Sequence, residues 1–141
     1  MIKKRIYIDG AWDLFHAGHL QLFKEIKKKF NYLIVGVHSD ELMEKVKRRP
    51  IIPYEDRAEI IKSIKYVDEI VGKSPFPTID FIKKHKIDLI AKTNSTLVAC
   101  DPKDEETIKK LNIFYSFESS KYHTSDIINK ITKNSLYTKT S

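Results

Sequence analysis

The chain has 141 residues, with 26 Lys and Arg against 19 Asp and Glu and a formal net charge of +7. This length favours one compact domain, and 41% hydrophobic residues are enough for a buried core, which excludes a disordered chain or a disulfide-stapled miniprotein. The single cysteine, Cys100, cannot form an internal disulfide and is typical of a reducing cytosolic or nuclear setting, so we expect a cytoplasmic protein. No apolar run approaches the ~20 residues of a membrane helix, and we expect the protein to be soluble.

Apolar runs alternate with amphipathic stretches along the whole chain, which is the pattern of a parallel sheet with crossover helices. The predicted strands are residues 5–8, 32–37, 66–71, 89–90 with their neighbours, and 113–117. The predicted helices are residues 19–29, 54–64, 78–84, 103–110 and 124–133. We therefore expect an α/β fold with a five-stranded parallel sheet over residues 1–133, followed by a frayed tail over residues 134–141.

Half of the four glycines, Gly10 and Gly18, fall in one ten-residue stretch, GAWDLFHAGH, between the first predicted strand and the first predicted helix. Glycine concentrated at such a junction indicates tight backbone geometry. In open parallel sheets ligands bind beyond the carboxyl ends of the strands, and the free N–H groups at a helix start attract anions. The sequence therefore predicts the functional site at this junction.

Two histidines of this stretch, His16 and His19, are spaced i, i+3, so in a helical turn both imidazoles project from one face near the helix N-terminus. Such a pair suits a phosphate chain whose negative charge grows during displacement. Asp13 could hold an imidazole in its useful tautomer or steer the loop. The same spacing also occurs in metal pairs and in surface histidines, and these alternatives stay open at this point.

The positive charge itself has two interpretations, a nucleic-acid surface or a site for a smaller polyanion such as a nucleoside triphosphate. Most lysine clusters are interpreted as solvated helix faces, because sequences such as KEIKKK are ordinary exposed helix. The cluster at residues 45–49 is the exception and is kept as a candidate site.

The stretch from Gly10 to His19 closely resembles the HxGH signature of the cytidylyltransferases, which follows the first strand and binds nucleotide phosphates. Residues 32–41, YLIVGVHSDE, and 65–71, KYVDEIV, resemble the second and third strands of the ethanolamine-phosphate and choline-phosphate enzymes. The resemblance covers residues 5–131 and implies a Rossmann-like nucleotidyltransferase fold. It implies an enzyme that transfers CMP from CTP to a small phosphorylated alcohol, with release of pyrophosphate, in phospholipid precursor synthesis.

By this resemblance His16 and His19 bind phosphate, and the backbone of Ala11 and Trp12 borders the nucleotide. The nucleotide-binding candidates of this stretch are Gly10, Ala11, Trp12, Asp13 and Gly18.

The resemblance also gives a role to the basic cluster. Lys47 lies ten residues before Arg57, the spacing of the family's catalytic lysine and of the arginine at its next helix start, while Arg48 replaces the usual glycine. Lys47 and Arg57 would clamp a triphosphate from the side opposite the histidines. No general base is needed, because a phosphomonoester oxygen is already ionised near neutral pH. Mg²⁺ is expected, bound mainly by phosphates and water, with no protein ligand assigned.

Two segments depart from the family. The segment that usually reads HGxD or HDD after the fourth strand is replaced by Lys92, Thr93, Asn94 and Ser95, so its carboxylate is absent. These four polar residues remain candidates for contacts to phosphate or ribose.

The late RTxGxSTTD signature is reduced to its Thr124-Ser125-Asp126 end. Here the candidates are His123, Thr124 and Ser125, and Thr124 is a predicted N-cap whose helix start could meet a phosphate or serve only as a cap.

Substrate and partners follow from the same comparison. Tyr66 occupies the position of a family tryptophan and a later tyrosine is missing, which disfavours a quaternary ammonium and favours phosphoethanolamine, followed by phosphocholine or glycerol-3-phosphate. The altered segments resemble the second repeat of the ethanolamine-phosphate enzymes, so a non-catalytic nucleotide-binding or regulatory module is the alternative. The KRRPIIP stretch is similar to small archaeal adenylyltransferases. Short free-standing relatives are homodimers, so we expect a homodimer that acts on small molecules, without nucleic acid or membrane insertion.

Overall fold

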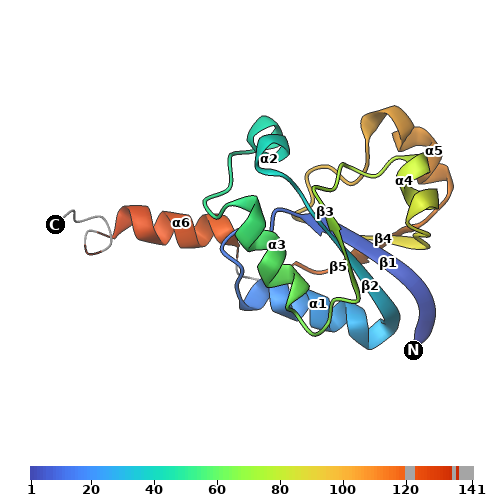
Figure 1. The fold of residues 1–141 in the computed structure, drawn as a ribbon, viewed down its shortest axis with the longest axis horizontal. Helices are drawn as coiled ribbons and strands as arrows, with labels where there is room; N and C mark the ends of the chain where they lie inside the picture. Colours follow the sequence, from blue (N-terminus) through green and yellow to red (C-terminus); the bar gives the residue numbers. More distant parts are fainter. Residues whose placement is uncertain (120–122, 135, 137–141) are drawn as a thin grey trace.

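A computed structural model describes residues 1–119, 123–134 and 136 of the chain. Five parallel strands form one sheet in the order β3-β2-β1-β4-β5 (Figure 1). The strands are β1 (Ile2–Gly10), β2 (Phe30–Val37), β3 (Glu69–Gly72), β4 (Leu89–Thr93) and β5 (Phe114–Phe117). The helices are α1 (Ala17–Lys29), α2 (Asp40–Val46), α3 (Tyr54–Lys62), α4 (Ile79–Lys84), the 3₁₀ turn η1 (Pro102–Asp104), α5 (Glu105–Lys110) and α6 (Thr124–Lys133). The predicted α/β fold with a five-stranded parallel sheet is confirmed.

Helices cover both faces of the sheet, as the two-residue alternation along β1 requires. Ile8 points to the face that packs against Phe23 of α1 and Ile61 of α3. Tyr7 points to the opposite face, where its ring meets the edge of Phe81 of α4 at a centroid distance of 5.2 Å. Each fully buried side chain of this kind contributes about 1.5–3 kcal/mol to folding. The two cores hold the carboxyl ends of the strands in fixed positions.

The strand order places a topological switch point between β1 and β4. From β1 the chain runs outward through β2 to β3, and it then returns to the other side of β1 to form β4 and β5. Connections therefore diverge above the carboxyl ends of β1 and β4, where a crevice opens and ligands of doubly wound sheets bind. Gly10 and Thr93 end these two strands.

One helix and the start of one strand differ from the sequence-based expectation, besides shifts of a few residues at other element ends. Helix α2 was not predicted; Ser39 caps it by accepting a hydrogen bond from the N–H of Leu42 at 3.1 Å. Strand β3 begins at Glu69 rather than at residue 66, because the backbone turns after α3. Those turns are closed by hydrogen bonds from the N–H groups of Ile64 and Val67 to carbonyls three residues earlier.

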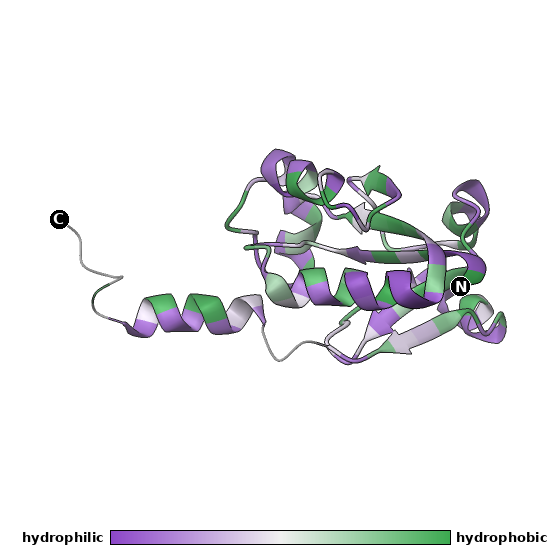
Figure 2. Cartoon of the chain, turned by 90° about the horizontal axis from the view of Figure 1, so that it is seen from below, coloured by the Kyte–Doolittle hydropathy of each residue, from purple (hydrophilic) through white to green (hydrophobic). Residues whose placement is uncertain are grey.

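The last helix, α6, matches its predicted bounds and projects from the body of the molecule (Figures 1 and 2). None of its residues is buried, and apolar side chains such as Ile131 are exposed along it. The predicted frayed tail of residues 134–141 falls mostly outside the described residues. No helix within the described ranges has the length and apolar character needed to cross a membrane.

Candidate functional site

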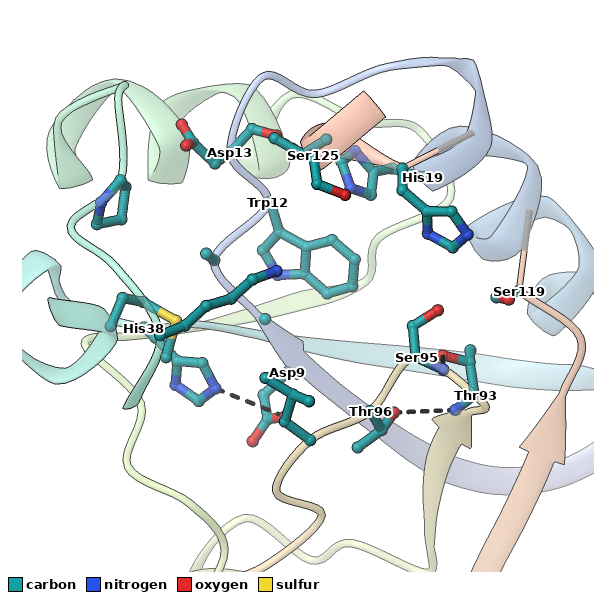
Figure 3. A pocket seen from close by; sticks show the side chains of 18 of the residues that line it. Asp9, Trp12, Asp13, His19, His38, Thr93, Ser95, Thr96, Ser119 and Ser125 are labelled. Carbon is teal, nitrogen blue, oxygen red and sulfur yellow. Dashed lines mark hydrogen bonds and ion pairs between the residues drawn. The ribbon is translucent and has the colours of Figure 1, made fainter. Parts of the chain in front are cut away.

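A cavity of about 480 Å³ lies at the switch point (Figure 3). Its walls come from the end of β1 with the following loop, the first turn of α1, the loops after β2 and β4, residues 46–50 and the start of α6. The predicted site residues that line it are Gly10, Ala11, Trp12, Asp13, His16, Gly18, His19, Lys47, Thr93, Ser95, His123, Thr124 and Ser125. Three other candidates, Arg57, Lys92 and Asn94, do not line this cavity.

The loop after β1 is held by its tryptophan. Trp12 and Leu14 have positive φ angles of 56° and 48°, so the chain turns sharply here. The Trp12 indole folds back into the core and donates a hydrogen bond to the carbonyl of Gly36 at 2.9 Å. A Cβ at Gly10 would lie 3.0 Å from the Trp12 ring, so glycine at this position allows the close packing. The predicted tight geometry therefore arises from packing against Trp12.

His16 and His19 form a reciprocal cap on the first turn of α1. The Nδ1 of His16 accepts a hydrogen bond from the N–H of Gly18 at 3.0 Å, and the N–H of His16 donates to Nδ1 of His19 at 3.2 Å. The two rings stack with centroids 3.9 Å apart. Since Nδ1 accepts in both neutral rings, each keeps its proton on Nε2. The cap thereby sets both tautomers without help from Asp13.

The environment keeps both imidazoles neutral near pH 7. Burial, the neighbouring His16 and His123 lower the pKa of His19 from 6.5 to about 4, although the charge of Asp13 acts in the opposite direction. Burial and His123 also lower the pKa of His16. A neutral imidazole with its proton on Nε2 can donate a hydrogen bond to an anion, and both rings lie next to a helix N-terminus.

Asp13 is buried and holds the basic loop over the cavity. Its carboxylate accepts hydrogen bonds from the N–H groups of Ile51 and Ile52 at 2.9 Å each and from Nη1 of Arg48 at 2.9 Å. Burial alone would raise the pKa of Asp13, but these donors outweigh it and lower the pKa below 3.8. Of the two roles predicted for Asp13, the structure supports steering of the loop.

Lys47 and Arg48 line the same cavity as the two histidines. Lys47 ends α2, where its N–H donates to the carbonyl of Met43, and its exposed side chain lines the cavity. Arg48 also lines the cavity, with its guanidinium paired to Asp13. The loop thus brings two cations to the wall, one of them already paired.

Arg57 is placed differently from the prediction, which had it contact the triphosphate. Its side chain is 0% exposed. It donates to the carbonyls of Ile52, Ala11 and His38 at 2.7–3.0 Å and to the carboxylate of Asp40 at 2.5 Å. With its donors engaged in this way, Arg57 joins α3 to the loops that build the cavity and does not face into it.

The side chains at the end of β4 point to two different sides of the strand. Thr93 and Ser95 line the cavity, and the N–H of Thr93 donates to the hydroxyl of Thr96 at 3.0 Å. The Lys92 ammonium instead lies 5.0 Å from the ring centroid of Phe114 on the far side of the strand. Alternation of side chains along β4 separates Lys92 from Thr93, so the predicted contacts of Lys92 with a ligand in this cavity are not supported.

Residues at the start of α6 form part of the cavity wall. The helix begins at Thr124 with His123 as its N-cap, so the prediction of Thr124 as the N-cap was wrong by one residue. The Thr124 hydroxyl instead donates to the backbone carbonyl of Asp13 at 2.9 Å. This bond ties the last helix to the loop that follows β1.

The cavity contains residues that the sequence analysis missed, namely Asp9, His38 and Phe76. Asp9 is in β1 directly before Gly10, and His38 follows the last residue of β2, so both could have been found as polar residues at the carboxyl ends of strands. Phe76 lines the cavity, whereas Tyr66, which occupies the position of a family tryptophan, does not. Within the described ranges, no group of three or more His, Cys, Asp or Glu side chains surrounds a possible metal position.

A doubly wound parallel sheet whose switch-point cavity offers hydrogen-bond donors and cations at a helix start is the architecture of a nucleotide-binding α/β protein. The cytidylyltransferase-like family matches residues 7–135, and the chain belongs to this family. Choline-phosphate cytidylyltransferase of Saccharomyces cerevisiae is 38% identical over 132 residues, which are 90% of this chain and 31% of the yeast protein. The chain therefore spans about a third of that relative.

Other relatives differ in name and length. FAD synthase of Pyrococcus horikoshii is 36% identical over 93% of this chain and 94% of its own length. Ethanolamine-phosphate cytidylyltransferase of Mus musculus is 35% identical over 71% of this chain and 25% of its own length. Among solved structures, a lipopolysaccharide core biosynthesis protein from Thermoplasma volcanium superposes with a TM-score of 0.67 at 26% identity, covering 85% of this chain and 98% of that one.

Proposed function

We propose that the protein transfers CMP from CTP to phosphoethanolamine and releases pyrophosphate. The observation that carries this proposal is one cavity lined both by two neutral imidazoles at the start of α1 and by Lys47. Donors from two separate segments suit a triphosphate whose charge must be stabilised during displacement.

The reaction is an in-line displacement at the α-phosphorus. The ionised phosphomonoester oxygen of the acceptor forms a bond to the α-phosphorus, while the bond from that phosphorus to the bridging oxygen of the β-phosphate breaks. Pyrophosphate leaves with this oxygen. The Nε2–H groups of His16 and His19 donate to the phosphate oxygens, and the Lys47 ammonium neutralises the leaving group. Mg²⁺, when bound, would be held mainly by phosphate and water oxygens and would supply further charge neutralisation.

Arg57 acts at a distance as a positioning residue. Its bonds to the carbonyls of Ala11 and His38 fix the loops after β1 and β2, which carry the cavity's polar groups. Thr93, Ser95, His123 and Ser125 are proposed to contact the nucleoside or the phosphates, because they line the same cavity as Lys47.

The identity of the acceptor substrate is proposed from the residues at the floor of the cavity. The carboxylate of Asp9 lies there beside His38 and Phe76, and a carboxylate is the group that receives a cationic head group. It takes the place of the carboxylate missing from residues 92–95.

The experiment is a pyrophosphate-release assay with CTP or ATP against phosphoethanolamine, phosphocholine, glycerol-3-phosphate and FMN. We expect the fastest release with CTP and phosphoethanolamine. Release with ATP and FMN would instead support an adenylyl transfer of the FAD synthase kind, an alternative favoured by the nearly full-length match to that relative. A thermal shift with CTP but no release with any acceptor would support a non-catalytic nucleotide-binding module.

We further propose a homodimer that works in the cytoplasm on small molecules. Support comes from the resemblance to short homodimeric cytidylyltransferases and from the single cysteine. Light scattering after size exclusion tests the dimer, and a mass of one chain of 16.5 kDa would contradict it.

A further inference from the structure

The cavity floor contains a carboxylate and an imidazole that meet at the carboxyl ends of neighbouring strands. The N–H of His38 donates to the carbonyl of Gly10 at 3.0 Å, which extends the β1–β2 pairing by one residue and places His38 beside Asp9. The Nε2 of His38 lies 3.6 Å from Oδ1 of Asp9 (Figure 3). The side chain of Asp9 is 13% exposed and that of His38 is 3% exposed.

The hydrogen bonds of His38 determine where its proton sits. Nδ1 lies 2.7 Å from the backbone carbonyl of Ser74, and since a carbonyl oxygen only accepts, Nδ1 carries a hydrogen. In a neutral ring Nε2 would then face the Asp9 carboxylate with a lone pair, which is a repulsive contact. A second proton at Nε2 makes the contact an ion pair, so the Asp9 carboxylate favours a protonated His38 ring.

The other groups around the pair agree with this assignment. Burial alone lowers the pKa of His38, but Asp9 and the Ser74 carbonyl outweigh burial and raise the pKa above 6.5, against the opposing charge of Arg57. The hydroxyl of Tyr7 stays neutral, because burial and the charge of Asp9 raise its pKa. Within the described residues, Oδ2 of Asp9 is buried without a hydrogen-bond partner.

We propose that the primary ammonium of an ethanolamine head group binds at Asp9 and Nε2 of His38 and displaces the second proton of the His38 ring, which passes to solvent. This inference rests on the proposed function, whose acceptor it explains. Charge is conserved at the floor, since one cation replaces another.

The spacing of the two atoms suits such an ammonium. Hydrogen bonds from nitrogen are about 2.8–3.0 Å long, so a single nitrogen can reach both Oδ1 of Asp9 and Nε2 of His38 across their 3.6 Å separation. A primary ammonium has three N–H donors and satisfies both acceptors. The trimethylammonium of choline has none, and it is best held by several aromatic faces. His38 is therefore the residue that distinguishes ethanolamine from choline.

The direct test measures the number of protons released when the ligand binds. Binding of CDP-ethanolamine and CDP-choline to the whole protein is measured by calorimetry at pH 6.5 in two buffers of different ionisation enthalpy. We expect CDP-ethanolamine to release up to one proton more than CDP-choline does, and the difference to vanish as the pH rises above the pKa of His38. Equal proton release for both ligands would overturn the inference.

Two substitutions at one position separate the roles of the ring nitrogens. His38→Asn keeps an N–H near Ser74 but removes the acceptor next to Asp9, so the preference for CDP-ethanolamine over CDP-choline should fall about tenfold, the effect of one hydrogen bond to a charged group. His38→Gln keeps an acceptor in that place without a titrating proton, so the preference should persist without extra proton release. His85→Asn, at the C-cap of α4 and outside the cavity, is the matched control and should change neither quantity.

The outcomes distinguish this inference from the proposed function. Turnover of phosphoethanolamine with unchanged preference in His38→Asn would overturn the inference and leave the proposed function standing. Preferential, proton-releasing binding of CDP-ethanolamine without turnover would support the ammonium site and contradict the proposed transfer reaction.

Discussion

The two ring nitrogens of His19 have different roles. Nδ1 completes the helix cap, and Nε2 remains available for the proposed ligand. Nδ1 accepts the N–H of His16, so the cap itself directs the proton to Nε2. The half-buried ring is held between Trp12 and Phe15 at centroid distances of 5.6 and 5.1 Å. A donor held by packing and by a backbone bond is preorganised for an anion.

His19→Ala should lower turnover by about 10²–10³-fold, the usual cost of removing one donor to a developing charge. It should also lower the free energy of unfolding by about 1 kcal/mol through loss of the cap bond. Pyrophosphate release and urea unfolding measure the two effects, with Gln21→Ala on the exposed face of α1 as control. Unfolding at ambient temperature would show that the residue is mainly structural.

Arg57→Met tests whether this arginine acts through structure. The substitution leaves the carboxylate of Asp40 and the carbonyls of Ala11, His38 and Ile52 without their donor, so stability should fall by about 3–5 kcal/mol. Thermal denaturation measures the loss, and Arg49→Met, with a side chain 53% exposed, is the control. A variant that melts like the wild type but does not turn over would place the guanidinium at the substrate.

At the scale of elements, a single aspartate joins three segments of the site. Asp13 belongs to the loop after β1, its carboxylate holds the loop between α2 and α3, and its carbonyl receives the hydroxyl of Thr124 from α6. The Lys47 loop is therefore anchored to the same residue as the last helix.

Asp13→Asn should reduce kcat/KM for CTP by about tenfold or more, because a charged acceptor of three hydrogen bonds is lost and the Lys47 loop loosens. Arg48→Gly removes the ion pair, the hydrogen bond to the carbonyl of Arg49 and one cation that lines the cavity, but it leaves the bonds of Asp13 to Ile51 and Ile52, so its effect should be smaller. Steady-state kinetics compare the two variants. Equal losses of kcat/KM in the two variants would mean that activity depends on the ion pair and not on the anchored loop.

Much of the arrangement of strands and helices was predictable from the sequence. The alternation of apolar runs with amphipathic stretches indicated the five strands and the helices α1, α3, α4, α5 and α6, and the clustered glycines indicated the site. Helix α2, with seven residues, was not predicted, although α4 and α5 have only six residues each. The roles of Asp9, His38 and Arg57 depend on which strand ends are neighbours and on which side chains are buried, and both are tertiary properties that local patterns do not contain.

For the molecule as a whole, the histidines give pH dependences of opposite sign. His19 has its folded-state pKa lowered to about 4, so its stabilising contribution is present above pH 6.5 and is lost as the pH falls toward 4. His38 has its folded-state pKa raised, so its contribution is present below pH 6.5 and is lost as the pH rises through the folded-state value.

Urea unfolding of the wild type and His19→Gln between pH 4 and 7 checks the first of these signs. Gln is neutral throughout, so the wild type should lose stability relative to the variant as the pH falls from about 6.5 toward 4. A stability difference that stays constant over this range would contradict a neutral, buried His19.

The net charge of +7 is the other property of the whole molecule that bears on function. Lysines occupy the last turns of α1 to α6, which suits the helix dipoles, while among the described residues Lys47 and Arg48 are the lysine and arginine that line the cavity. Only a small part of the charge is therefore assigned to the ligand.

A crystal structure with CTP tests the central claim most directly. We predict the triphosphate in the switch-point cavity, with α- or β-phosphate oxygens within hydrogen-bond distance of Nε2 of His16 or His19 and with the Lys47 ammonium on the opposite side. A triphosphate bound outside this cavity, or beyond the reach of both histidines, would contradict the account.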